Sequence, residues 1–290
     1  GLKLDRGWEK SASWKELVIV VHGFNSAPEE LTALVEPLRR SGLPCGMFQY
    51  PNDQSITESA QQFSQELKQL AARHPERHIA LVTHSMGGLV ARECIENTDL
   101  DPGNVHRLIM VAPPTHGSRL AHVALLGDVY EHLVAIPLKK PGSARILGPL
   151  KDGLGEARHD LKPGSEFLRR LSSRPRNPKV AYSVFLGTRA PLNRDDLATL
   201  RSQVDNASDD NRVVQLIAPK LRTWLTDFDE MVDGVGDGVV AVKRGRLNDV
   251  EDTMLLPFDH WLIGPKSEGI KKLQTELLAR HMRHYSNLDE

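Results

Sequence analysis

Continuous runs of apolar residues alternate, along the first 112 residues, with longer segments in which apolar residues recur every three or four positions. A continuous run is typical of a parallel strand that is buried on both faces of a sheet. The runs predict strands at residues 17–21, 45–50, 78–84 and 107–112. With helical segments between them, they predict an α/β fold with a doubly wound, mostly parallel sheet.

The helical segment after residue 54 has the most regular pattern. Ser55 and Glu58 match a capping box, a reciprocal pair of hydrogen bonds that starts a helix. Apolar residues then follow at intervals of four and three, at Ile56, Ala60, Phe63, Leu67 and Leu70. Later apolar runs predict two more strands, at residues 180–187 and 253–257. The chain closes with an amphipathic helix, in which we expect His281 and His284 to face solvent.

The alternation of strands and helices is interrupted twice. Residues 115–178 contain helical patches separated by prolines and glycines, and they are too long for a simple connection. Residues 189–232 are polar and then amphipathic, which predicts a second helical insertion with one long helix broken at Pro219. We therefore interpret residues 1–290 as a single domain with two insertions.

The first insertion, residues 115–178, has apolar residues in helical register that the sheet does not account for. Ligands of open α/β sheets bind at the carboxyl ends of the strands, where an inserted segment can close over them. We predict that this insertion is a cap over a hydrophobic pocket, with Leu133 and Ile136 contacting substrate. The alternative is that it packs on the flank of the sheet as added core.

Composition excludes some function classes. Lys and Arg total 37 against 38 Asp and Glu, for a net charge of −1, so no basic surplus favours nucleic acid or an anionic membrane surface. Cys45 and Cys94 have neither metal-ligand spacing nor a disulfide framework, and we expect buried thiols. No stretch reaches the length of a membrane span. Because the chain begins with Gly1, a preceding segment could have been removed, and both a cytoplasmic and an exported protein are compatible with the sequence.

Candidate chemistry is concentrated in the string His84-Ser85-Met86-Gly87-Gly88, where a strand stops and a helix begins. A nucleophile elbow places its serine at such a turn, with small residues two positions before and two after it. Gly87 fits this pattern, whereas Thr83 departs from it. The alternative is a serine in an ordinary loop between strand and helix.

A serine nucleophile needs a histidine base, and the base needs a carboxylate. In α/β-hydrolases, whose serine occupies such an elbow, the acid and the histidine come later in the chain, in that order. His260 follows the last predicted strand, and Asp237 begins a Gly-Val-Val run that we interpret as the chain returning to the sheet. Asp233 is the second candidate for the acid. Asp259 adjoins His260 and is expected in a surface turn.

Together these strings resemble α/β-hydrolases of the lipase and esterase superfamily. The resemblance is carried by His22-Gly23-Phe24, the elbow at residues 83–88, Pro114-Thr115-His116-Gly117-Ser118, Asp237-Gly238-Val239-Val240 and Phe258-Asp259-His260. The string at residues 114–118 and residues 161–168 are also similar to bacterial lipases and to GPI-inositol-deacylase-like proteins. The resemblance implies an α/β-hydrolase fold with an inserted helical cap.

The resemblance also implies roles for individual residues. The backbone N–H groups of Phe24 and Met86 would form the oxyanion hole, and Ser85, Asp237 and His260 would hydrolyse a small ester or a lipid through an acyl-enzyme. His22 and His84 are predicted to contact the substrate. No metal or organic cofactor is needed for this reaction.

Two other functions are compatible with the same residues. One is an acyltransferase or thioesterase that uses the same triad, and the other is a non-catalytic hydrolase-fold protein that binds a lipid or a partner protein, which Thr83 favours. The acidic residues between 205 and 210 would suit calcium, although a loop that caps a helix explains them more simply.

Overall fold

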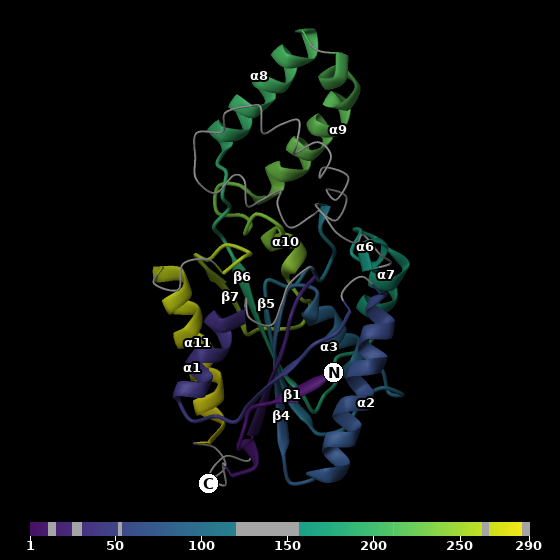
Figure 1. Cartoon of the computed structure of the whole chain (residues 1–290), viewed down its shortest axis with the longest axis vertical. Coiled ribbons are helices and arrows are strands. Elements are labelled where there is room, and N and C mark those ends of the chain that lie inside the picture. Colours follow the sequence, from purple (N-terminus) through teal and green to yellow (C-terminus); the bar gives the residue numbers. More distant parts are fainter. Residues whose placement is uncertain are drawn as a thin grey trace.

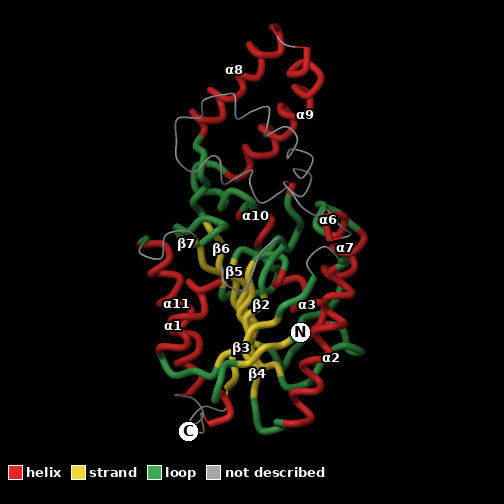
Figure 2. Tube along the Cα trace, in the orientation of Figure 1, coloured by secondary structure: helices red, strands yellow, loops and turns green. Residues whose placement is uncertain are grey.

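The structure is a computed structural model of the chain, and it describes residues 1–10, 16–24, 31–51, 54–119, 157–210, 212–262 and 267–285. Leu133 and Ile136, with most of the first predicted insertion, lie outside the described residues. A sheet occupies the centre, helices cover both of its faces, and a helical hairpin extends beyond one end (Figure 1, Figure 2).

Within the described residues the sheet has seven strands, in the order β1-β3-β2-β4-β5-β6-β7. They are β1 (Leu2–Leu4), β2 (Glu16–Val21), β3 (Cys45–Phe48), β4 (His78–His84), β5 (Val105–Val111), β6 (Ala181–Gly187) and β7 (Thr253–Leu256). β1 is antiparallel to β3, and the other neighbouring pairs are parallel. The predicted doubly wound sheet is confirmed. The pattern does not predict β1, because three residues are too few to show a period.

The central strands explain the continuous apolar runs. All the residues of β2 are buried, and in β4 only His78 is exposed. Side chains of β2 point alternately into two cores, with Ile19 in one and Val18 and Val20 in the other. Both faces of these strands are therefore apolar.

Helices form a layer on each face of the sheet. α1 (Thr32–Arg40) and α11 (Glu268–Tyr285) cover one face, and α2 (Ile56–Arg73) and α3 (Gly87–Glu96) cover the other (Figure 1). The predicted capping box starts α2: Ser55 Oγ accepts the Glu58 N–H at 3.2 Å, and Glu58 Oε2 accepts the Ser55 N–H at 3.1 Å. Three short helices are η1 (Trp8–Lys10), η5 (Asp229–Met231) and α10 (Val242–Gly245).

The described end of the first insertion lies on the flank of the sheet. It forms α6 (Ala157–Asp160) and α7 (Glu166–Ser173), beside α2 and α3 (Figure 1). Phe167 and Leu171 belong to the same core as Phe63 of α2 and Leu89 of α3. These residues therefore add to the core, while a cap formed by the remainder of the insertion stays a prediction.

The second insertion forms the hairpin of α8 (Arg194–Asp210) and α9 (Arg212–Phe228). β6 leads into it, so it lies beyond the carboxyl ends of the strands (Figure 1). Its apolar side chains form a separate core, which includes Leu197, Leu221, Trp224, Leu225 and Phe228. We call this cluster the hairpin core.

The predicted break at Pro219 is wrong, because α9 continues through that residue. A proline in a helix removes one backbone hydrogen bond. Here Ala218 and Leu221, on either side of it, are buried in the hairpin core, and packing offsets the local cost. The acidic residues 205–210 belong to α8 and do not form a loop, and Asp205 pairs with Arg222 at 2.8 Å.

His281 is not the solvent-facing residue that its helical position suggested. Its side chain has 0% exposure, and its Nδ1 lies 2.5 Å from Glu16 Oε2, at the amino end of β2. His106 Nε2 contacts the other carboxylate oxygen of Glu16 at 2.8 Å. Burial alone would raise the pKa of Glu16, but the hydrogen bonds from the two histidines lower it to about 2. A buried carboxylate thus fastens α11 to the sheet.

Candidate active site

Ser85 lies in the sharp turn between β4 and α3, at the carboxyl edge of the sheet. Its φ of 52° is in the left-handed region, which is unusual for a residue with a side chain. A Cβ atom on Gly87 would lie 2.5 Å from the His22 carbonyl oxygen and 2.7 Å from that of Val21. The turn therefore requires glycine at position 87, as in a nucleophile elbow.

The threonine at position 83 is compatible with this turn. Its side chain is buried, and Thr83 Oγ1 lies 3.3 Å from the Ile109 carbonyl oxygen on the neighbouring strand. A Cβ atom on Gly88 would come within 3.3 Å of Thr83 Oγ1. The second glycine of the elbow thus leaves room for the larger residue at position 83.

Three side chains that are far apart in the sequence form a continuous chain of hydrogen-bonding contacts. His260 Nε2 lies 3.0 Å from Ser85 Oγ, and His260 Nδ1 lies 2.8 Å from Asp237 Oδ2. A carboxylate only accepts, so Nδ1 carries a proton and Nε2 of the neutral ring can accept one from the serine. The other carboxylate oxygen, Asp237 Oδ1, accepts the N–H groups of Val239 at 2.9 Å and Val240 at 2.7 Å.

The candidate acid and base lie on separate loops over the end of β6. Asp237 follows η5, and His260 follows β7. The His260 N–H donates to the Asp237 carbonyl oxygen at 3.0 Å, so the backbones of the two loops are joined as well as their side chains. A Cβ atom on Gly187, the last residue of β6, would lie 2.6 Å from Asp237 Cβ and 2.6 Å from the Phe258 carbonyl oxygen. A glycine at the strand end therefore allows both loops to approach.

The other candidate acids are placed differently. Asp233 is exposed, and its Oδ2 accepts from Arg194 Nε at 2.7 Å. Asp259 is partly exposed, in a turn closed by a 3.0 Å hydrogen bond from the Leu262 N–H to the Asp259 carbonyl oxygen. Of these three aspartates, the structure brings Asp237 into contact with His260.

The two predicted oxyanion donors flank Ser85. Met86 is the N-cap of α3, where backbone N–H groups have no acceptor within the helix and the helix dipole favours negative charge. Phe24 follows Gly23, on which a Cβ atom would lie only 2.8 Å from Ser85 Cβ. The loop after β2 therefore passes directly against the serine.

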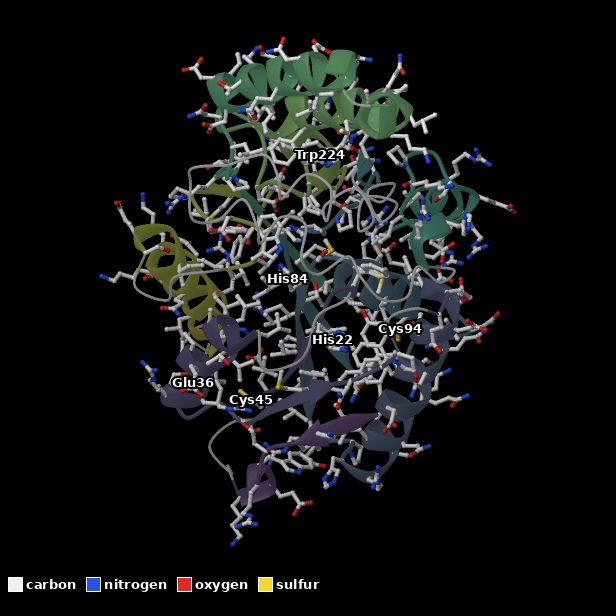
Figure 3. All side chains as sticks on the ribbon, turned by 45° about the horizontal axis from the view of Figure 1, so that its top comes forward. His22, Glu36, Cys45, His84, Cys94 and Trp224 are labelled. Carbon is white, nitrogen blue, oxygen red and sulfur yellow. The ribbon has the colours of Figure 1, made fainter. Side chains whose placement is uncertain are left out.

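His22 and His84 both lie at the centre of the molecule, and Figure 3 labels them. The ring of His22 stacks on Tyr50 with centroids 4.4 Å apart, and its Nδ1 lies 2.9 Å from the Gly23 carbonyl oxygen. His84 Nε2 lies 2.8 Å from the carbonyl oxygen of His260. Burial, then repulsion by a charged His260, lower the pKa of His84 to about 3, so this ring is neutral.

Two features of the site were not predicted from the sequence, the contact of His84 with His260 and the role of Gly187. The contact between His84 and the backbone of His260 joins residues 176 positions apart, and neither residue type predicts it. Gly187 had a weak signal, as a glycine at the end of an apolar run.

In the part of the chain that the structure describes, no three His, Cys, Asp or Glu side chains are grouped as metal ligands. No helix there is both long and apolar enough to cross a membrane.

Comparison with protein families matches residues 48–154 to a family described as a domain of unknown function (DUF7379). That match covers fewer than half of the residues of the chain. Comparison with curated protein sequences gives no match.

Several solved structures are similar to this chain. The mature form of the lipase BlEst2 of Bacillus licheniformis is 18% identical over 90% of this chain and 91% of its own, with a TM-score of 0.59. The metagenomic carboxyl esterase MGS0156 is 17% identical over 93% and 75% of the two chains, with a TM-score of 0.53. Phospholipase PlaB of Legionella pneumophila is 19% identical over 80% of this chain and 45% of its own, with a TM-score of 0.51. At such identities the likeness shows the fold, which is that of the α/β-hydrolases.

Proposed function

We propose that this protein is a serine carboxylic-ester hydrolase of the lipase or esterase type. The observation that supports it most is the chain of contacts Ser85–His260–Asp237 at the elbow, with distances of 3.0 and 2.8 Å. Each group has the neighbour that its chemical task requires. The solved structures with the same fold are described as a lipase, a carboxyl esterase and a phospholipase, which supports ester bonds as the target.

In the first step Ser85 Oγ attacks the ester carbonyl carbon while its proton passes to His260 Nε2. Asp237 stabilises the imidazolium, and two backbone N–H groups orient its side chain by donating to Oδ1. The N–H groups of Phe24 and Met86 bind the negative oxygen of the tetrahedral intermediate. The imidazolium then protonates the leaving alcohol, and an acyl-enzyme remains.

In the second step water takes the place of the alcohol. His260 removes a proton from the water, and the water oxygen attacks the acyl carbonyl carbon. As the bond between that carbon and Ser85 Oγ breaks, His260 returns the proton to Ser85 Oγ, so the acid leaves and the free serine is restored. Because the triad side chains are buried, little bulk water screens these charges.

The insertions would border the acyl pocket. The hairpin of α8 and α9 lies beyond the carboxyl ends of the strands, on the side where Ser85 opens (Figure 1). We propose that the part of residues 115–178 outside α6 and α7 forms the cap, with Leu133 and Ile136 contacting the acyl chain, and that residues 189–232 form a second wall. Replacing Leu133 and Ile136 by Ser should then change the preferred chain length more than the melting temperature.

Hydrolysis of p-nitrophenyl esters of increasing chain length tests the proposed reaction. We expect wild-type protein to release p-nitrophenol and the free acid, and Ser85→Ala to lower the rate at least about 10⁴-fold with an unchanged melting temperature. Ser173→Ala is a matched control, because Ser173 is exposed and its Oγ donates to the Arg170 carbonyl oxygen at 2.8 Å. Release of acyl product only when an alcohol or thiol acceptor is added would indicate a transferase. Equal rates in wild type and Ser85→Ala would contradict the proposal.

A further inference from the structure

The ring of His84 lies against the base of the triad. His84 is the last residue of β4 and directly precedes Ser85, and its ring centroid lies 4.9 Å from that of His260. Its Nε2 lies 2.8 Å from the His260 carbonyl oxygen. A carbonyl oxygen only accepts, so Nε2 carries a proton and donates it.

Two hydrogen bonds thus fix the peptide groups of His260. Its N–H donates to the Asp237 carbonyl oxygen at 3.0 Å, and its C=O accepts from His84 at 2.8 Å. The first bond ties the base to the loop of the acid, and the second ties it to the strand of the nucleophile. The backbone of the base is therefore fixed relative to both groups that its ring must reach.

The charge state of His84 suits this position. Its pKa is lowered to about 3 by burial and by repulsion from a charged His260, so the ring is neutral at the pH at which His260 works. An imidazolium can then form on His260 with no second positive charge beside it. A lysine or arginine donor at position 84 would oppose that charge.

We propose that His84 is a positioning residue, which holds the His260 backbone so that Nε2 of His260 stays in line with Ser85. This inference rests on the proposed function and adds a residue to it. His84 would act through His260 and not through contact with the substrate. An error of about 1 Å in the placement of a reacting group can cost about a hundredfold in rate, so the contact should affect kcat.

Two substitutions at this position separate the donor from the bulk of the ring. In His84→Gln the side-chain amide nitrogen can occupy the place of Nε2 and donate to the same carbonyl, whereas His84→Leu fills the space and cannot donate. We expect His84→Leu to lower kcat about 10- to 100-fold with KM changed less than about twofold. His84→Gln should recover kcat to within about fivefold of wild type.

A buried histidine at the opposite edge of the sheet provides the control. His281→Gln removes the ring that contacts Glu16, and it should lower the melting temperature without changing kcat. If His84→Leu behaves in the same way as His281→Gln, the positioning role is overturned. It is also overturned if His84→Gln is as slow as His84→Leu.

A measurement without substrate distinguishes this inference from the proposed function. The proton on His260 Nδ1, shared with Asp237 at 2.8 Å, should give a downfield proton NMR signal. We expect that signal in wild type and His84→Gln, and its broadening or loss in His84→Leu. Wild-type protein that shows this pattern but hydrolyses no ester would overturn the proposed function and support the positioning role. An identical signal in all three proteins would overturn the positioning role.

Discussion

The proposed nucleophile and its proposed acid and base are supported by two different regions of the molecule. Ser85 is placed by residues next to it in the sequence, the strand β4 before it and the helix α3 after it, and both pack into the cores on the faces of the sheet. Asp237 and His260 are 23 residues apart, on loops that pack against the hairpin core. The position of the proposed nucleophile depends on local sequence, whereas the positions of the proposed acid and base depend on tertiary packing.

The hairpin core includes residues near the proposed acid and base in the sequence. Val232 and Ala241, on either side of Asp237 in the sequence, belong to it, and Trp261, directly after His260, packs against it. Gly238 has a φ of 99°, and a Cβ atom there would lie 2.6 Å from Pro191 and 3.2 Å from Trp261. The second insertion therefore supports two of the three residues of the proposed triad. A substitution in the hairpin should therefore displace Asp237 and His260 more than it displaces Ser85.

Of the substitutions in the region of Asp237 and His260, replacing Asp237 should lower kcat the most. Asp237→Asn keeps the size of the side chain but removes the charge that fixes the His260 tautomer, so kcat should fall about a thousandfold. Asp233→Asn is the matched control, because Asp233 is exposed and pairs with Arg194. It should change kcat less than about twofold, measured as ester hydrolysis by folded protein. A larger loss for Asp233→Asn than for Asp237→Asn would show that Asp233, and not Asp237, is the acid.

A pair of core substitutions compares the two regions directly. Phe228 lies in the hairpin core and Phe63 in the sheet core, and both have 0% exposure. Replacing either by Leu leaves a small cavity and should cost roughly 1 to 2 kcal/mol of stability. Only Phe228→Leu should also lower kcat, by about tenfold, at a temperature where both variants are folded. Equal kcat values would show that the hairpin does not support the acid and the base.

The pH dependence of stability tests the amino end of the sheet, which is opposite the proposed triad. The pKa of Glu16 is about 2 in the folded chain, below the usual 4.5, so Glu16 stabilises the fold fully above about pH 4.5. This contribution, a few kcal/mol, is lost as the pH falls from 4.5 towards 2. Glu16→Gln should flatten the stability curve over that window and leave kcat at neutral pH unchanged. Urea unfolding at several pH values measures it, and an unchanged slope would contradict the assignment.

The parts of this molecule that sequence can predict are those whose cause is local. The capping box at Ser55 and the continuous run of β4 need only neighbouring residues, and both are present in the structure. The turn at Ser85 can be predicted in the same way, because a strand pattern, the serine and two glycines follow one another in the sequence. Local pattern was enough to place these elements.

The predictions that were wrong concern residues whose partners lie far away in the chain. His281 has the spacing of a surface residue, but it pairs with Glu16, which is 265 positions away. Pro219 obeys the local rule for a helix break, but burial of its neighbours in the hairpin core outweighs that rule. The contact of His84 with the His260 carbonyl also needs the completed fold. Contacts between residues so far apart cannot be predicted from a short segment of sequence.

The most direct measurement is to map a fluorophosphonate probe on the intact protein, because this reagent bonds to a serine only when a base activates it. We expect one adduct per chain by mass spectrometry, on the peptide that contains Ser85, and no adduct in Ser85→Ala. His260→Ala should leave Ser85 unlabelled although the serine is still present. Labelling of another residue, or none in folded wild-type protein, would contradict the assignment of Ser85, His260 and Asp237 as a catalytic triad.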